Sequence, residues 1–134
     1  WPKSTITGVD IRPVARPAAY NFWINQDFLL TDAEGTFDCV VGNPPYNYAE
    51  QFIRHSMKHM ESGGHLILLL RLNFLESQSR AKGLWRQHPP YKVVVCSSRI
   101  SFTGDGQTNA TAYAYFLWQK DWAGETALTW SKAS

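Results

Sequence analysis

The sequence predicts an α/β fold that contains a βαβ unit. Short runs rich in apolar and β-branched residues, each followed by a turn or polar segment, lie at residues 5–11, 20–25 and 37–42. A segment with helical periodicity follows at 49–61, and Gly63-Gly64 is a helix stop signal. The run HLILLL at 65–70 is apolar on both faces, as expected of a central parallel strand. Strand, helix and strand in this spacing make a βαβ unit.

The rest of the chain continues the same alternation. A second helix is expected from about Leu75 to Gln87, because Pro89-Pro90 would end it. Two further strands are expected at 92–97 and 112–118, separated by the polar, glycine-bearing loop SFTGDGQTNAT at 101–111. Loops of this length are often functional. The tail at 122–134 is compatible with an edge strand or with irregular structure.

Size and composition favour one compact domain over residues 1–134. A chain of 134 residues with 44% hydrophobic residues closes one core but not two. No apolar run approaches the length of a membrane span, and the N-terminus has no signal pattern. Cys39 and Cys96 lie within β-branched runs and are expected to be buried free thiols. These features predict a soluble cytoplasmic protein without a membrane partner.

Charge is divided unevenly between the two halves of the chain. Residues 1–67 hold five Lys/Arg and seven Asp/Glu, a net charge of −2, whereas residues 68–134 hold eight and four, a net charge of +4. This pattern favours the C-terminal half as the side that a phosphate-bearing partner approaches, although a solvated face is an equally simple interpretation.

The segment FDCVVGNPPYN at 37–47 carries the strongest chemical signal. Asn43-Pro44-Pro45-Tyr46 directly follows a buried strand, at the carboxyl end where open α/β sheets place their ligands. Taken alone, such a segment is simply a turn. In this position the Asn43 side-chain oxygen and the Pro44 carbonyl can accept the two N–H groups of an amine conjugated to an aromatic ring. The prolines stiffen the segment, and Tyr46 offers a flat face on which a base can stack.

FDCVVGNPPYN resembles the catalytic motif of the S-adenosylmethionine-dependent DNA adenine N6-methyltransferases. The resemblance extends over roughly residues 5–119, through GVDIRP, NQDFLL, GGHLILLLRLNFL and RISFTGDG. It implies a Rossmann-like class I methyltransferase sheet, mostly parallel, with an antiparallel strand near the C-terminus. It also implies S-adenosylmethionine as cofactor and DNA, through a flipped adenine, as partner.

Roles for individual residues follow from the same resemblance. Asp10 corresponds to the ligand of the cofactor ribose, and Asp27 to the ligand of its adenine amino group. Phe28 corresponds to the aromatic residue that packs on the cofactor's adenine ring. Asn43, Pro44, Pro45 and Tyr46 form the catalytic motif. Phe102 is the candidate ring that holds the flipped adenine from its other side, opposite Tyr46.

Two parts of the family pattern have no counterpart in these residues. The first strand with its glycine-rich turn and helix would precede the Asp10 strand, and only WPKS stands before residue 5. The expectation is therefore a partial catalytic domain, lacking its first βα unit, with a second polypeptide as a candidate source of that segment. A separate target-recognition domain is not expected within residues 1–134.

The leading interpretation is methyl transfer from S-adenosylmethionine to the exocyclic N6 of adenine in DNA. The motif also occurs in methyltransferases that act on protein glutamine side chains or on amino groups of ribosomal RNA. A non-catalytic remnant or half-enzyme, which would need a second chain, is the alternative from another class.

A metal site is not expected. His55 and His59 have the spacing of metal ligands on a helix, but a third ligand and a glutamate between them are missing, so they are expected on a solvated face.

Overall fold

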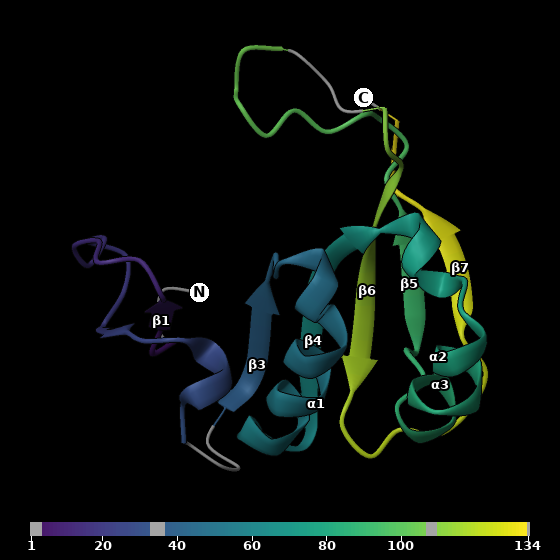
Figure 1. Ribbon diagram of the computed structural model, residues 1–134, viewed down its shortest axis with the longest axis horizontal. Helices are drawn as coiled ribbons and strands as arrows, with labels where there is room; N and C mark the ends of the chain where they lie inside the picture. Colours follow the sequence, from purple (N-terminus) through teal and green to yellow (C-terminus); the bar gives the residue numbers. More distant parts are fainter. Residues whose placement is uncertain (1–3, 33–36, 107–109, 134) are drawn as a thin grey trace. The chain divides into compact units, whose positions relative to one another are not determined.

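The computed structural model describes residues 4–32, 37–106 and 110–133; residues 107–109 of the loop predicted at 101–111 thus lie outside the described part. The chain divides into two compact units, Trp1–Ala33 and Glu34–Ser134, and each is described by itself (Figure 1). A single catalytic domain over residues 1–134 stays a prediction.

The first unit is built on two parallel strands. β1 (Thr7–Asp10) pairs with β2 (Phe22–Asn25), and the register places Asp10 opposite Asn25. A single 3-10 turn, η1 (Phe28–Leu30), follows β2. The strands predicted at 5–11 and 20–25 are therefore confirmed, with shorter bounds.

A five-stranded sheet forms the second unit. It contains β3 (Phe37–Gly42), β4 (Met60–Arg71), β5 (Lys92–Val95), β6 (Tyr113–Gln119) and β7 (Ala127–Trp130) in the order β3-β4-β6-β5-β7. β3 is parallel to β4 and β5 is parallel to β7, whereas β6 is antiparallel to both of its neighbours. The sheet is therefore mixed, and the antiparallel strand predicted near the C-terminus is β6. The tail contributes an edge strand.

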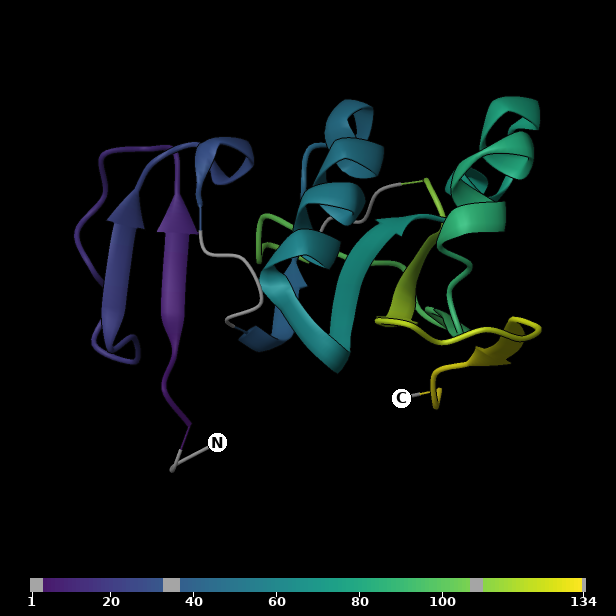
Figure 2. The ribbon, with the colours of Figure 1, turned by 90° about the horizontal axis from the view of Figure 1, so that it is seen from below.

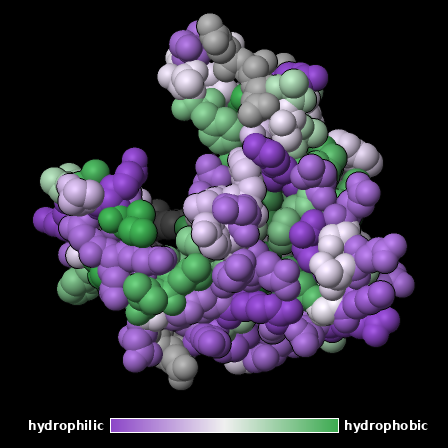
Figure 3. All heavy atoms as spheres, viewed as in Figure 1, coloured by the Kyte–Doolittle hydropathy of each residue, from purple (hydrophilic) through white to green (hydrophobic). Residues whose placement is uncertain are grey.

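The helices of this unit lie on one side of the sheet (Figure 2). They are η2 (Tyr46–Tyr48), α1 (Ala49–His59), η3 (Leu72–Leu75), α2 (Gln78–Lys82) and α3 (Leu84–Gln87). α1 connects the parallel strands β3 and β4, which confirms the predicted βαβ unit. The outward surface of the helices is mostly hydrophilic (Figure 3).

The core lies between these helices and the sheet. Its buried side chains come from α1, β4 and β6 above all and include Ile53, Met57, Leu66, Leu68, Leu70, Phe116 and Trp118. The Trp118 indole N–H donates to the His88 carbonyl at 2.9 Å, which satisfies its polar atom. Burial of this apolar surface is the main favourable term in folding.

The opposite face of the sheet is less buried than the sequence predicts. Leu66, Leu68 and Leu70 point into the core, but Ile67 and Leu69 on the other face of β4 are only half-buried. Val41 of the edge strand β3 is exposed. HLILLL is thus a strand with one fully buried face, because the helices of this unit cover one side of the sheet.

Both predicted helices differ in part from the structure, although the predicted end at Gln87 is confirmed. α1 ends at His59, and Gly63-Gly64 lie inside β4 rather than after the helix. Gly63 has φ 79°, and a Cβ on Gly64 would lie 2.9 Å from the Glu61 carbonyl oxygen, so both glycines serve an irregular strand start. The helix predicted from Leu75 to Gln87 is divided into α2 and α3 at Gly83.

The predicted burial of both cysteines and the predicted exposure of His59 are also wrong. Both cysteines are free, but Cys39 is exposed because β3 is an edge strand, and Cys96 is half-buried. His59 is buried on α1, and its Nδ1 donates to the His55 carbonyl at 2.8 Å. None of the helices in the described residues is long and apolar enough to span a membrane.

Candidate active site

The Asn43-Pro44-Pro45-Tyr46 segment leaves the carboxyl end of β3 and leads into α1. β3 ends at Gly42, and Pro45, with φ −56° and ψ 131°, keeps the backbone extended until η2 begins at Tyr46. The Tyr48 N–H donates to the Pro45 carbonyl at 3.0 Å and closes the turn. The chain therefore crosses the strand end in a defined conformation, as two successive prolines require.

The two predicted amine acceptors stand side by side in the sequence at this strand end. Asn43 is exposed and Pro44 is buried. Within the described part of the chain, no hydrogen bond ends on the Asn43 side-chain oxygen or on the Pro44 carbonyl. Both oxygens are therefore able to accept hydrogen bonds from a ligand.

The structure brings Tyr46 and Phe102 to the same aromatic ring. Tyr113, the first residue of β6, has its ring centroid 6.0 Å from that of Tyr46 and 5.1 Å from that of Phe102. Tyr113 is only 3% exposed, whereas Phe102 is 49% exposed. Two rings predicted to hold one base thus share a buried support at the carboxyl end of β3 and β4.

The Tyr46 side chain is uncharged at neutral pH. Burial, together with a hydrogen bond from its hydroxyl to Tyr113, raises the pKa of Tyr46 to about 12, although the nearby Arg71 acts in the opposite direction. The Arg71 Cζ lies 4.6 Å from the Tyr46 ring centroid. The phenol therefore stays protonated at neutral pH and offers an uncharged face for stacking.

Tyr113 was not singled out by sequence reasoning, which used AYAYFLW only as a strand. Its signal is its position: a phenol two residues after the polar loop at 101–111, on a strand whose other buried residues are apolar. A hydroxyl at a buried strand end needs a partner, and here the partner is Tyr46.

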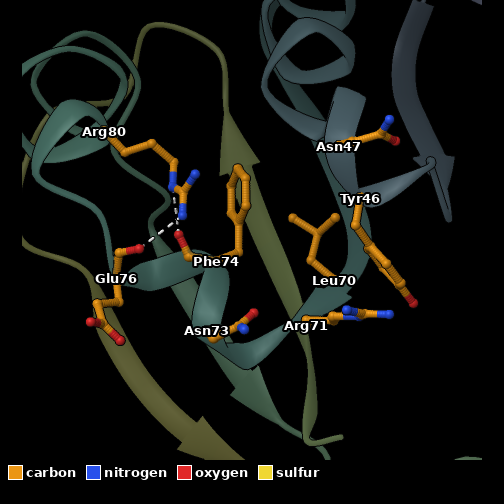
Figure 4. A pocket seen from close by; sticks show the side chains of 8 residues that line it. All are labelled: Tyr46, Asn47, Leu70, Arg71, Asn73, Phe74, Glu76 and Arg80. Atoms are coloured by element: carbon orange, nitrogen blue, oxygen red, sulfur yellow. Dashed lines mark hydrogen bonds between the residues drawn. The ribbon is translucent and has the colours of Figure 1, made fainter.

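An open cavity of about 400 Å³ lies beside Tyr46 (Figure 4). Tyr46 and Asn47 form one side, and residues of η3 and α2 form the other. The full lining comprises Tyr46, Asn47, Leu70, Arg71, Asn73, Phe74, Glu76 and Arg80. Leu70 and Arg71, the last residues of β4, lie between the two sides (Figure 4).

In the first unit, Asp10 and Asp27 come to the same end of the parallel pair. Asp10 is the last residue of β1, and Asp27 follows β2 by two residues. Because β1 and β2 are parallel and adjacent, their carboxyl ends meet at one edge. Asp27 accepts a hydrogen bond from the Leu29 N–H at 3.0 Å, and Phe28 beside it is half-buried.

The Asp10 carboxylate is held by its neighbour Arg12. Its Oδ1 accepts from the Arg12 backbone N–H at 2.9 Å and from Nε at 3.0 Å, while its Oδ2 accepts from Nη2 at 2.7 Å. These hydrogen bonds lower the pKa of Asp10 from 3.8 to about 2. The side chain therefore stays an ionised acceptor throughout the neutral and mildly acidic range.

The Asp10 carboxyl is expected to titrate near pH 2 in the wild-type chain and at a higher pH in Arg12→Ala, because the variant loses the side-chain hydrogen bonds. The backbone N–H of residue 12 still donates to Asp10 in the variant, so the pKa should rise only part of the way toward 3.8. Since the folded-state pKa is the lower one, the stabilising effect of this pair is fully present above pH 3.8 and is lost as the pH falls toward 2. Carboxyl-detected NMR titration checks this. A wild-type midpoint near 3.8 would contradict the pairing.

Among residues 4–32, 37–106 and 110–133, no group of three His, Cys, Asp or Glu side chains is placed to hold a metal ion. The two helix histidines lie with ring centroids 4.2 Å apart, so the pair is a packing contact of α1.

No protein-family model matches this sequence, and no curated protein matches it. Solved structures do resemble it. A protein assigned to the class I S-adenosylmethionine-dependent methyltransferases, from Listeria monocytogenes, superposes with a TM-score of 0.69 at 14% identity, covering 94% of this chain and 49% of its own length. The chain has a class I methyltransferase fold.

Two further methyltransferase structures support the assignment of the fold. The N-methyltransferase NodS from Bradyrhizobium japonicum has a TM-score of 0.59 at 16% identity over 87% of this chain and 73% of its own. A protein assigned as a DNA modification methylase from Thermus thermophilus has a TM-score of 0.52 at 12% identity over 98% of this chain and 56% of its own. The chain spans about half the length of the Listeria and Thermus proteins, and at these identities the likeness shows the methyltransferase fold alone.

Proposed function

We propose that this chain carries the catalytic part of an S-adenosylmethionine-dependent methyltransferase that acts on the exocyclic N6 of adenine in DNA. One observation supports the proposal above all: an Asn-Pro-Pro-Tyr segment leaves the carboxyl end of a strand, and its Tyr46 ring and the ring of Phe102 both pack near the ring of Tyr113. The methyltransferase fold supports the reaction class, and DNA modification methylase is among the functions assigned to proteins of similar fold.

The first unit contains residues that fit the nucleoside half of the cofactor. Asp10 and Asp27 place two carboxylates at the carboxyl end of one parallel strand pair, where ligands of open α/β sheets bind. Carboxylates accept hydrogen bonds from ribose hydroxyls and from an adenine amino group. Phe28, next to Asp27, adds an aromatic face for the adenine ring. The cofactor, when bound, supplies an electrophilic methyl group.

Asn43 and Pro44 present the amino group of the target base. Its nitrogen lone pair is delocalised into the adenine ring and is a poor nucleophile. Accepting both N–H groups, on the Asn43 side-chain oxygen and the Pro44 carbonyl, favours a lone pair localised on the nitrogen. Pro45 fixes the backbone that follows the Pro44 carbonyl, with φ −56°.

Tyr46 and Phe102 hold the target base, with Tyr113 as their shared support. A base that leaves the duplex loses its stacking partners, and aromatic side chains replace them. The hydrogen bond that the Tyr46 hydroxyl donates to Tyr113, together with the buried position of the Tyr113 ring, restricts the orientation of Tyr46. The site therefore favours a flat, uncharged acceptor such as a nucleobase.

The proposed function is tested by offering the chain three acceptors with methyl-labelled cofactor: adenine-containing DNA, a glutamine-containing peptide and ribosomal RNA. We expect label in DNA only. Label in the peptide or RNA instead would reassign the substrate. Calorimetry with S-adenosylmethionine accompanies the assay, because a chain that neither binds cofactor nor transfers label would be a half-enzyme that needs a second polypeptide.

Tyr46→Ala is expected to weaken binding to DNA with a mispaired adenine by roughly 1 to 3 kcal/mol, the usual cost of losing one aromatic stacking partner. Fluorescence anisotropy with labelled duplex measures this. Tyr48→Ala is the matched control: this tyrosine lies two residues on, in the same 3-10 turn, and is 49% exposed. Equal losses in both variants would mean that the Tyr46 ring does not hold the base.

A further inference from the structure

We propose that Arg71 binds a DNA phosphate next to the target adenine, in the cavity beside Tyr46. The inference rests on the proposed function, because its ligand is the backbone of the DNA that carries the base. It adds an anion site to the aromatic rings and amine acceptors described above.

The cavity adjoins the ring that is proposed to hold the base. Tyr46 belongs to its lining, and Arg71 ends β4 directly beside it (Figure 4). The β4–β6 register also makes Arg71 the partner of Tyr113. A ligand group in this cavity would therefore be a close neighbour of a base stacked on Tyr46, as a backbone phosphate is of its own base.

Arg71 has the features of an anion-binding side chain. Its side chain is exposed, and its guanidinium lies over the Tyr46 ring, with Cζ 4.6 Å from the centroid. Among the described residues, Arg71 forms no ion pair with a carboxylate. Arg71 also donates a hydrogen bond to the Tyr46 hydroxyl. A guanidinium has five N–H donors in a planar fork, so the remaining donors suit bidentate contact with phosphate.

Arg80, the second arginine of the cavity, forms hydrogen bonds within the protein. Arg80 donates from Nε to the Phe74 carbonyl at 2.8 Å and from Nη2 to the Glu76 carbonyl at 2.9 Å. Its Cζ lies 4.3 Å from the Phe74 ring centroid. Arg80 therefore links η3 to α2 by hydrogen bonds and adds positive charge to the lining of the cavity. Arg71 remains the residue that can reorient toward a ligand.

The residues that line the cavity favour binding of a nucleic-acid phosphate over binding of a peptide carboxylate. Arg71 and Arg80 outweigh the one acidic side chain, Glu76, and the amides of Asn47 and Asn73 add neutral donors. Residues 68–134 as a whole carry a net charge of +4, from eight Lys/Arg and four Asp/Glu. Every base in DNA is accompanied by flanking phosphates, whereas a peptide has no obligatory anion beside its target.

The salt dependence of DNA binding tests the proposal. The probe is a labelled duplex with one mispaired adenine and randomised flanks. For Arg71→Gln we expect the slope of log Kd against log[salt] to fall by about 0.9, the value for one phosphate contact, with affinity lower by about tenfold. Arg71→Lys should keep most of the slope. Arg86→Gln, which removes an exposed arginine outside the cavity, should leave the slope unchanged. Equal changes in Arg71→Gln and Arg86→Gln would overturn the proposal.

A neutral methylphosphonate linkage beside the mispaired adenine tests the same contact without altering the protein. The wild-type chain should lose about tenfold in affinity at one of the two flanking linkages, and Arg71→Gln should lose less than twofold there. Equal losses in both proteins would overturn the inference while leaving the proposed function intact. A wild-type chain that does not bind this DNA at all would overturn both. If binding of an acidic peptide required Arg71 and binding of DNA did not, the site would be assigned to a carboxylate and the phosphate would be rejected.

Discussion

Replacing Asn43 with alanine is expected to lower the rate of methyl transfer by about 10²- to 10³-fold, the usual loss when one preorganised polar contact to a reacting group is removed. Asn43 is exposed directly after β3 and belongs to the second unit, whereas the residues proposed to bind the cofactor nucleoside belong to the first. Cofactor affinity measured by calorimetry should therefore stay nearly unchanged.

Asn43→Asp is the conservative variant for this experiment. It keeps an acceptor oxygen at the same position, so it should retain more activity than Asn43→Ala. Turnover is measured as label transferred to DNA at saturating cofactor. A variant Asn43→Ala that loses cofactor affinity and turnover to the same extent would contradict the role of Asn43 as an amine acceptor.

Phe116→Ala is expected to lower the free energy of unfolding by about 3 to 5 kcal/mol, as large-to-small substitutions of core aromatic residues do. Phe116 is fully buried, with its ring centroid 5.9 Å from those of Phe74 and Trp118. Removing the ring leaves a cavity at the centre of the layer between sheet and helices. Urea unfolding followed by tryptophan fluorescence measures the change.

Tyr115→Ala is the matched control, because Tyr115 is the preceding residue of β6 and points to the less buried face, with 43% of its surface exposed. Its replacement should cost less than about 1 kcal/mol. Similar losses in both variants would mean that the face of β6 opposite the helices is covered in solution as well.

The sequence was sufficient to predict the parts of the fold that depend on local pattern. The βαβ unit follows from the helical periodicity of 49–61 between two apolar runs, and the structure has it as β3, α1 and β4. The position of Asn43-Pro44-Pro45-Tyr46 at a strand end was predictable for the same reason, because Gly42 ends the apolar run. The proximity of Tyr46 and Phe102 came from a family resemblance, and the structure supplies the ring between them.

Features that depend on tertiary context were not predictable from local pattern. Gly63-Gly64 is a helix stop signal in sequence, yet the pair serves an irregular strand start, where a positive φ and a close backbone approach exclude side chains. Cys39 lies in an apolar run, but its exposure depends on β3 being an edge strand. The support that Tyr113 gives to Tyr46 requires the β4–β6 pairing, which no short-range pattern specifies.

In the proposed function, the segment after β3 presents the amino group of adenine for methylation. Mass spectrometry of nucleosides, after incubation of the chain with labelled S-adenosylmethionine and DNA, tests it most directly. We expect label in N6-methyl-2′-deoxyadenosine, and loss of that label when Asn43 is replaced with alanine. Label in cytosine, or transfer to adenine that persists in Asn43→Ala, would rule out this role of the segment.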